Sequence, residues 1–571
     1  MHRPPQTLGL GLVAFALIAG CAWNATASSS IAGAPVLRPD AGVWIFEKSV
    51  PPPSIRPGTD TPAGMRDWTF APNVRVHPQE SGQHLWPDIA AAEDGTIGVA
   101  WMDEHTAGGY HIFYTFSTDG GLTWASPERV DDRTTGAYSK FVSIAFTPFG
   151  TAVAVWEDDR TGQINLYFSK RTGAPGHPWT ANVRVNATGG PPSTYDYMNG
   201  SLAVLDEQRY FVAWTDWREG TFYQVYMRGT NDGGATWGPE HRISDEIGYE
   251  PVAGDPCLIV DPNQIEPGAE VLYCVTNDWR GYAPGGRVPN VYYYRSGNGG
   301  ATWSVGVRAN DIEPGFQQTS SHALVKLDDG ALAAGWLNNP DWGINHFRVC
   351  RSIDQGGTWG ASVPVDEPGS GGTGTVSSIA TDGSYLYAAY DRYATSWDAF
   401  FRASPDGGIT WPYPSQRMDD DATGAAAGNA VIAAPRYAIV PPERSQEIHA
   451  VWQDNRAPSY DWKIYATHGS VPGQGLPEPV APASMLGLRI SPNPSRTGRA
   501  VLLAPVSSDA SREVTIFDAA GRAIRSLSLA PSGVLWDGRD ALGRPVPAGC
   551  FRIRASGAEA GSAGTALVRV R

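Results

Sequence analysis

Acidic and basic side chains recur together at the ends of apolar segments in this sequence. In the run from Trp156 to Arg160, an arginine follows shortly after two aspartates. The related runs are Trp214-Thr215-Asp216-Trp217-Arg218, Asn277-Asp278-Trp279-Arg280, Tyr390-Asp391-Arg392 and Trp452-Gln453-Asp454-Asn455-Arg456. A guanidinium pairs with a carboxylate through two parallel hydrogen bonds. Either each arginine braces its own corner of the chain, or some of them point inward and bind the carboxylate of a ligand.

Aromatic residues and histidine occur in the segments that lead into the apolar strands. They are His84, Trp86, Tyr138, Tyr195, Tyr197, Tyr249 and Phe316. Flat apolar rings beside Asp, Asn and Arg are what a saccharide or a peptide surface requires for stacking and orientation. The alternative is that several of the rings fill a central channel. The ligand-binding candidates are Arg160, Arg218, Arg280, Arg392, Arg456, Trp86, Tyr138, Tyr197 and Tyr249.

A short motif places these residues in a repeating framework. The segment Ser117-Thr118-Asp119-Gly120-Gly121-Leu122-Thr123-Trp124 returns in four further copies. Its acidic or amide position is occupied by Asp119, Asp232, Asn298, Asp354 and Asp406. The pattern predicts a tight hairpin turn in which this side chain bonds backbone N–H groups two residues further on. Glycine supplies the positive φ, and the tryptophan packs against the neighbouring sheet. We expect these side chains to be structural.

Each copy of this motif belongs to a unit of four predicted strands. The last unit ends before its fourth strand, and the segment Trp68–Val76 resembles a fourth strand without earlier partners. Pairing the two ends closes the array and removes open sheet edges. The sequence therefore predicts an all-β, seven-bladed propeller over residues 67–469, or six blades if one unit is irregular.

The remaining segments predict an exported chain with a small second domain. Residues 1–20 have the features of a lipoprotein signal peptide with Cys21 as the lipidated residue, and Ala25-Thr26-Ala27 offers an alternative cleavage site. Residues 21–66 read as a flexible tether, and 470–486 as a Pro/Gly linker. Residues 487–571 show short alternating strands and glycine turns, which favour a β-sandwich.

The amino-acid composition limits which binding partners and metals the protein can have. The 571 residues carry a formal net charge of −15, and no basic stripe is present, which argues against a nucleic-acid partner. No cysteine spacing fits a zinc site, while Cys257 and Cys274 lie on neighbouring predicted strands as either a disulfide or two buried thiols. Asp419-Asp420-Asp421 suits calcium or, more commonly, a solvated loop. We expect no metal and no cofactor.

Through its five repeated turns, the segment 67–469 resembles the sialidase-like Asp-box (BNR-repeat) propellers. The resemblance implies three arginines that hold a substrate carboxylate, a Tyr–Glu nucleophile pair and an acid/base aspartate. No Tyr–Glu partner can be assigned from the sequence, although Tyr249-Glu250 lies in a loop on the expected face. The family's first arginine lies in an Arg-Ile-Pro motif, whereas the opening strand here reads Trp86-Pro87-Asp88-Ile89-Ala90. The C-terminal domain resembles the Ig-like (FlgD-like) domain of flagellar hook-capping proteins, which implies attachment or export.

These observations favour a monomeric, surface-anchored binding protein. Its ligand is a glycan or a cell-surface protein, bound on the face that carries the second-to-third-strand corners and the loops leading into each first strand. Contact with a membrane is expected only through the lipid anchor. The alternatives are an exo-acting glycoside hydrolase of sialidase type, whose catalytic residues are unknown, and a structural envelope protein.

Overall fold

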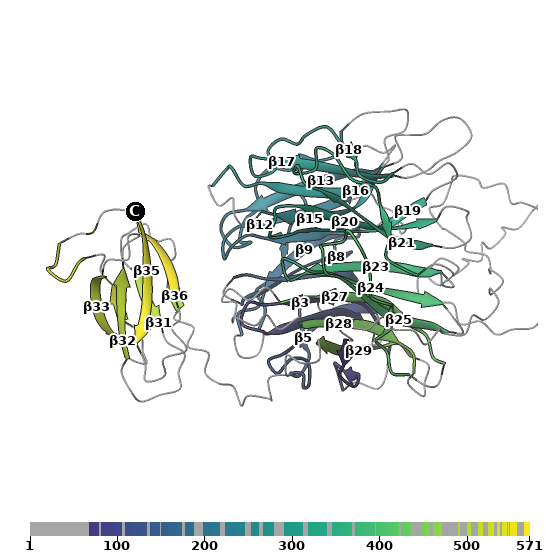
Figure 1. Ribbon diagram of the computed structural model, residues 1–571, viewed down its shortest axis with the longest axis horizontal. Coiled ribbons are helices and arrows are strands. Elements are labelled where there is room, and N and C mark those ends of the chain that lie inside the picture. The colour runs from purple at the N-terminus through teal and green to yellow at the C-terminus, as the bar shows by residue number, and fades with distance from the viewer. Residues whose placement is uncertain are drawn as a thin grey trace, which may run out of the picture. The chain divides into compact units, whose positions relative to one another are not determined.

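The computed structural model describes residues 68–470 apart from loop segments, of which 188–197, 279–289 and 436–446 are the longest. In the C-terminal part it describes 489–491, 500–503, 512–517, 523–529, 534–536, 539–544, 546, 549–556 and 565–570. All regular elements in these ranges are strands (Figure 1). The chain divides into two compact units, Met1–Gln474 and Gly475–Arg571. Within the described residues, no helix is long and apolar enough to cross a membrane.

Short antiparallel strands in the first unit follow one another in sets of four. Set 1 contains β3 (His84–Ala91), β4 (Ile97–Asp103), β5 (Gly109–Ser117) and β6 (Glu128–Arg129). Set 2 contains β7 (Ala137–Phe146), β8 (Ala152–Asp158), β9 (Asn165–Lys170) and β10 (Val183–Arg184). Set 3 contains β11 (Ser201–Val204), β12 (Tyr210–Asp216), β13 (Gln224–Thr230) and β14 (His241–Arg242). Set 4 contains β15 (Ala253–Val260), β16 (Leu272–Asp278), β17 (Asn290–Ser296) and β18 (Val307–Arg308).

The later sets repeat this order. Set 5 contains β19 (Gln318–Lys326), β20 (Leu332–Asn339), β21 (His346–Ser352) and β22 (Val363–Pro364). Set 6 contains β23 (Thr373–Thr381), β24 (Leu386–Tyr393), β25 (Trp397–Ser404) and β26 (Gln416–Arg417). Set 7 contains β27 (Ala427–Ala433), β28 (Glu447–Asp454) and β29 (Lys463–Ser470), and β29 also pairs with the two N-terminal strands β1 (Thr69–Phe70) and β2 (Val74–Arg75). As predicted, Trp68–Val76 completes the last set.

The first strands of successive sets contact one another around a closed circuit. Contacts run from β3 to β7, and then in turn through β11, β15, β19, β23 and β27 back to β3. One hydrogen bond recurs in every set, from a backbone N–H near the start of the third strand to a side chain just beyond the fourth strand. Its acceptors are Asp131, Asn186, Ser244, Asn310, Asp366, Asp419 and His77.

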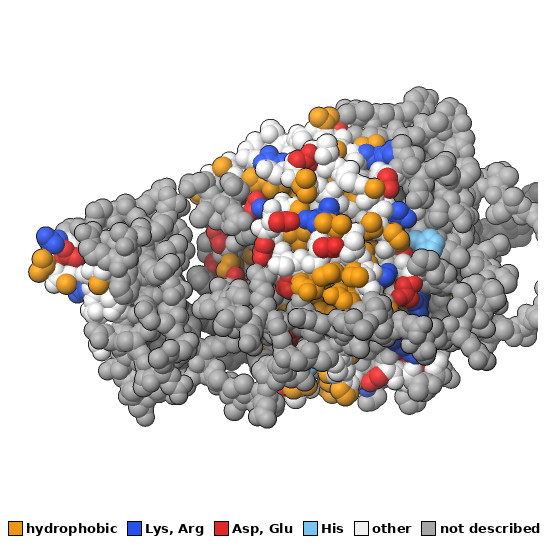
Figure 2. Space-filling model, viewed as in Figure 1, with side chains coloured by type: hydrophobic (Ala, Val, Ile, Leu, Met, Phe, Trp, Pro, Cys, Tyr) orange, Lys and Arg blue, Asp and Glu red, His pale blue; other side chains and the backbone are white. Residues whose placement is uncertain are grey.

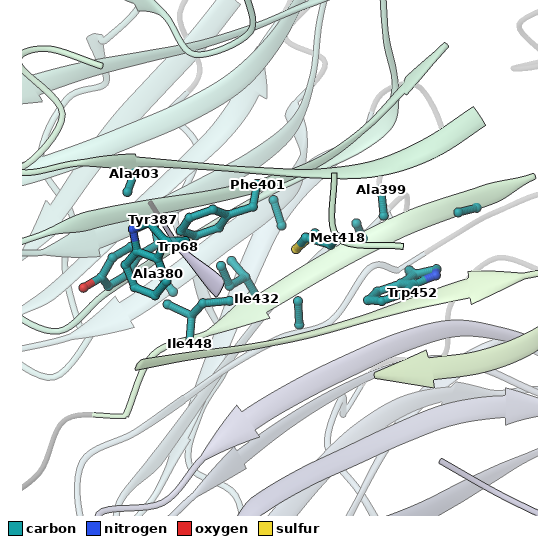
Figure 3. Packing of buried hydrophobic residues seen from close by; sticks show 14 residues of the cluster. Trp68, Ala380, Tyr387, Ala399, Phe401, Ala403, Met418, Ile432, Ile448 and Trp452 are labelled. Atoms are coloured by element: carbon teal, nitrogen blue, oxygen red, sulfur yellow. The ribbon is translucent and has the colours of Figure 1, made fainter. Parts of the chain in front are cut away.

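Apolar side chains fill the space between adjacent sets. Trp68 packs edge-on against Tyr387 and Phe401 of set 6, with ring centroids 5.4 and 4.9 Å apart (Figure 3). The tryptophans of the repeated turns do the same elsewhere, as Trp237 does on Phe168 and Trp359 on Tyr293. Each of these rings therefore joins its own set to the preceding one, which is where hydrophobic burial stabilises the unit most.

The repeated turns share one hydrogen-bond pattern. In the first, Ser117 donates its hydroxyl to Asp119 at 2.7 Å and accepts the Gly121 N–H at 2.8 Å. The Asp119 carboxylate accepts the backbone N–H and the hydroxyl of Thr123, at 2.9 and 2.5 Å. Asp232, Asn298, Asp354 and Asp406 occupy the same place. We predicted that this side chain bonds a backbone N–H two residues further on. That prediction was wrong, because the bonded N–H lies four residues further on. Gly120 and Gly121 have positive φ, as predicted.

The second unit contains two sheets. One comprises β30 (Arg489–Ser491), β31 (Ala500–Leu503) and β34 (Val534–Trp536). The other has the order β33 (Ala523–Leu529), β32 (Arg512–Phe517), β35 (Gly549–Ser556) and β36 (Thr565–Val570). The proposed linker, 470–486, and the N-terminal segments, including Cys21, lie outside the described residues apart from Ser470.

Cys257 and Cys274 are free thiols. Cys257 is opposite Val275 in the β15–β16 register, and Cys274 is opposite Leu258. Neighbouring residues of a strand point to opposite faces, so the two sulfurs lie on different faces of the sheet. Their places in different apolar clusters agree with this geometry. The disulfide alternative is therefore not formed here.

Candidate functional site

Strained residues gather at one end of the first unit. Trp86, Phe141, Asn199, Asp255 and Asn429 have positive φ angles of 54°, 47°, 44°, 50° and 55°. Four of them lie at a β-bulge in a first strand, and Asn199 lies just ahead of β11. Asn and Asp tolerate this left-handed conformation, whereas bulky Trp and Phe rarely adopt it. Such bulges redirect a side chain and are common beside binding sites. We call these five residues the bulge ring.

The preceding set holds several members of the bulge ring in place. Gln453 Oε1 accepts the Trp86 N–H at 3.2 Å, and Thr215 Oγ1 accepts the Asp255 N–H at 3.0 Å. Glu157 Oε1 accepts the N–H groups of Met198 and Asn199, both at 2.7 Å. Each of the three acceptor residues is the next-to-last residue of the second strand of its set. The strained backbone is therefore stabilised by contacts between sets, and the ring lies at the end where second strands lead into third strands.

Aromatic rings form one side of this site. Trp86 and Phe141 are half-buried and meet at a centroid distance of 5.5 Å in an edge-on arrangement. Tyr138 is 40% exposed, and its ring lies 5.8 Å from that of Tyr110. The Lys140 ammonium lies 4.5 Å above the Tyr138 ring. The predicted candidates Trp86 and Tyr138 thus lie on sets 1 and 2, beside two rings that the sequence analysis did not select.

Polar side chains form the adjoining side. Asn199 Nδ2 donates to one carboxylate oxygen of Asp255, and Asn277 Nδ2 donates to the other at 2.9 Å. Glu157 is 2% exposed and lies opposite Lys140 in the β7–β8 register. Burial raises the pKa of Glu157 to about 7, against the opposing effects of the Asn199 and Met198 N–H groups and of Lys140. Burial also lowers the pKa of Lys140. The site therefore combines apolar faces with fixed hydrogen-bonding groups.

Two corner arginines have equivalent surroundings. Arg160 contacts Asp158 and Asp132, both at 2.7 Å, and lies 4.2 Å above the Tyr167 ring. Arg456 contacts Asp454 at 2.7 Å and Asp420 at 2.5 Å, and lies 4.4 Å above Tyr465. In each case one acid belongs to the arginine's own set and the other to the preceding set. These arginines connect neighbouring sets, and their guanidinium groups are already occupied by carboxylates of this chain.

The other predicted arginines divide into three cases. Arg218 contacts Asp216 and Glu240, both at 2.5 Å, within its own set. Arg392 lies 3.8 Å above the Phe400 ring and 3.7 Å from Glu367. Its expected alignment was wrong, because the β-strand register places Arg392 where the other corners carry Asp216 or Asp158. Arg280 lies outside the described residues, as do Tyr195, Tyr197, Tyr249, Glu250 and Phe316.

Two further predicted residues belong to the interior framework. His84 is fully buried, and its Nδ1 lies 2.8 Å from Asp103. In the 419–421 run, Asp419 accepts the Ala399 N–H, and Asp421 accepts the Ala425 N–H. Among the described residues, no cluster of histidine, cysteine and acidic side chains has the geometry of a metal site.

Sequence reasoning missed Phe141, Asn199, Asp255, Asn429 and Glu157. A usable signal was present in three of them, because an Asn or Asp inside a strand pattern marks a position that tolerates positive φ. Phe141 and Glu157 have no sequence signal of this kind. Their roles follow from register between sets, which the pattern of a single strand does not reveal.

No protein-family model matches the sequence, and no curated protein matches it. Several solved structures are weakly similar. A protein of unknown function from Dyadobacter fermentans is 12% identical over 71% of this chain and 99% of its own, with a TM-score of 0.44. The Penicillium chrysogenum α-L-arabinanase, solved with arabinobiose, is 17% identical over 56% and 94%, with a TM-score of 0.41. The NanB sialidase from Streptococcus pneumoniae is 13% identical over 70% of each chain, with a TM-score of 0.36. At these values the similarities assign neither a family nor a substrate.

Proposed function

We propose that residues 67–469 form a seven-bladed Asp-box propeller that binds a glycan at the bulge ring. The closed circuit of first-strand contacts and the hydrogen bond that recurs in all sets support the seven blades. The N-terminal strand closes the last blade, and radial closure leaves no long sheet edge unpaired. The two sheets of the second unit support an Ig-like, FlgD-like sandwich. In this proposal the chain is exported and held at the cell surface by a lipid on Cys21.

The observation that carries the binding proposal is the strained pair Trp86 and Phe141. Both bulky residues have positive φ, which costs about 1–3 kcal/mol each. The strain places two partly buried rings against each other, at the same end of the unit as the hydrogen-bonded amide and carboxylate groups of Asn199 and Asp255. Aromatic rings with a few oriented polar groups are the usual means of recognising a saccharide.

The occupied corner arginines argue against a carboxylate clamp of the sialidase kind. Arg160, Arg218 and Arg456 each contact two carboxylates of the chain itself. A substrate carboxylate would have to displace these acids, at least one of which in each case is fully buried. We therefore expect no hydrolysis of a fluorogenic sialoside by the purified full-length chain.

A glycan array tests the binding proposal. The full-length chain is expected to bind one or more saccharides, and Trp86→Ala and Phe141→Ala are each expected to weaken binding about tenfold or more. Trp397→Ala is the matched control, since Trp397 is a 37% exposed tryptophan at the same end of set 6. Binding that falls equally in all three variants would place the site elsewhere. An array without hits would refute the proposal.

A further inference from the structure

Sets 1 and 2 are joined by a two-residue parallel ladder, whereas sets 5 and 6 are joined by the isolated antiparallel bridge between Asn345 and Thr373. The third strand β5 pairs in parallel with the first strand β7, through Gly109 opposite Ala137 and Tyr110 opposite Tyr138. In the part of the chain that the structure describes, this is the one place where two sets share a sheet. The pairing aligns two tyrosines across the boundary. The sheet therefore continues from the first strand of set 2 to the third strand of set 1.

Four aromatic rings lie in two pairs on sets 1 and 2. Trp86 and Phe141 meet in the bulge ring, and Phe141 is next in sequence to Lys140. Lys140 covers one side of Tyr138, whose ring meets that of Tyr110. Tyr138 and Lys140 point to the same side of β7 because they are two residues apart in a strand, and Ser139 between them points inward to Asp158. We call Trp86, Phe141, Tyr138 and Tyr110 the aromatic track.

The charges beside the aromatic track favour an uncharged ligand. The Arg133 guanidinium contacts Asp158 at 3.1 Å and Asp159 at 2.5 Å, and is thereby neutralised. Lys140 is partly buried and lies in the field of Glu157 and Asp159. Four described arginines of sets 1 and 2 already contact carboxylates of the chain, namely Arg129, Arg133, Arg160 and Arg171. A polyanionic chain requires paired contacts of this kind, and these four groups are engaged.

We propose that the aromatic track binds an extended, uncharged oligosaccharide, with one sugar at Trp86 and Phe141 and the following sugars on Tyr138 and Tyr110. This inference rests on the proposed glycan-binding function and adds the length and charge of the ligand. Rings that are spaced along a surface bind successive units of a chain, whereas the bulge ring alone binds a single unit. The Trp86–Phe141 end of the track determines which sugar is bound. The Tyr138–Tyr110 end adds affinity for longer chains.

Calorimetric titration of the full-length chain tests this inference. The probes are cello-, xylo- and chito-oligosaccharides of one to six units, with oligogalacturonates as anionic chains of matched length. For at least one uncharged series, affinity is expected to rise about tenfold or more between one and four units. Tyr138→Ala and Tyr110→Ala are each expected to remove most of this rise between one and four units. Trp86→Ala is expected to weaken binding at every length.

Two substitutions separate stacking from folding. Tyr110→Phe keeps the ring and is expected to retain the increase with chain length, whereas Trp397→Ala is the aromatic control in set 6. Equal affinity for one and six units, or preferred binding of oligogalacturonates, would overturn the track while leaving the bulge ring as a glycan site. Absence of binding to every carbohydrate on the array, and to all four series here, would overturn both proposals.

Discussion

The two ends of the first unit differ in how regular they are. At the turn end, where third strands lead into fourth strands, an Asp or Asn side chain accepts the backbone N–H of the threonine four residues later, at 2.8–2.9 Å in all five turns. At the bulge end, the equivalent positions carry Trp86, Phe141, Asn199, Asp255 and Asn429. Repetition at one end fits a role that every set shares, whereas variation at the other fits a role that is needed once. Charged groups of both signs are interspersed on the viewed side of this unit, around one larger gathering of hydrophobic side chains (Figure 2).

Glycine substitutions at the turn end should produce the largest effect. Gly356 has a φ of 87°, and a Cβ there would lie 1.9 Å from the Tyr293 ring. Gly356→Ala should therefore destabilise the protein by about 3–5 kcal/mol, through backbone strain and overpacking. The measurement is urea unfolding.

Gly120→Ala is the matched control for this experiment. Its φ is 74°, but the nearest atom to the added Cβ is Glu447 Oε1 at 3.9 Å. The equivalent position in another turn is Gln355, with a φ of 59°. Gly120→Ala should cost only about 1 kcal/mol. Equal losses in the two variants would contradict the view that the second glycine is required by packing between sets.

A pH titration of stability probes the bulge end. Burial raises the pKa of Glu157 from 4.5 to about 7, so the folded state holds this proton more tightly than the unfolded state does. The contribution of neutral Glu157 is full below pH 4.5, decreases as the pH rises, and is lost above about 7. The decrease amounts to about 3 kcal/mol.

Glu157→Gln should remove this decrease and keep the backbone at Asn199 in place, because Gln453 already performs the same task for Trp86. The measurement is the difference in unfolding free energy between wild type and variant at pH 4.5 and pH 8. A difference that does not change with pH would show that Glu157 is not protonated in the folded protein.

The corner arginines offer the smallest and most specific test. Arg160→Ala and Arg456→Ala should each destabilise the protein by about 1–2 kcal/mol, since both remove the same contacts between sets and remain partly solvated. Thermal unfolding measures the effect, and glycan affinity should not change in either variant. A loss of glycan affinity without a loss of stability would show that these arginines bind the ligand and do not stabilise the fold.

The sequence predicted the framework far better than the site. The tryptophan at the end of each repeated turn carries its own signal, since its glycine and threonine neighbours occur at fixed spacing. The closing role of Trp68–Val76 followed from the same repetition. The pairing of Trp86 with Phe141 had no such signal, because it depends on two bulges in different sets. The repeated pattern of the corner arginines suggested a ligand site for a related reason. Their role as links between sets is seen only in the structure, where Asp132 and Asp420 of the preceding sets lie beside Arg160 and Arg456.

The pairing of Thr69 with Ser470 has a mechanical consequence. The chain enters the ring at β1 and leaves it at β29, and these antiparallel strands are joined side by side at that shared point. Tension between the two flanking segments would therefore load the hydrogen bonds of this pair one after another, as in opening a zipper, rather than all together in shear. If the N-terminal side is held at a membrane and the C-terminal side is held elsewhere, this seam is the first part of the ring to open under force.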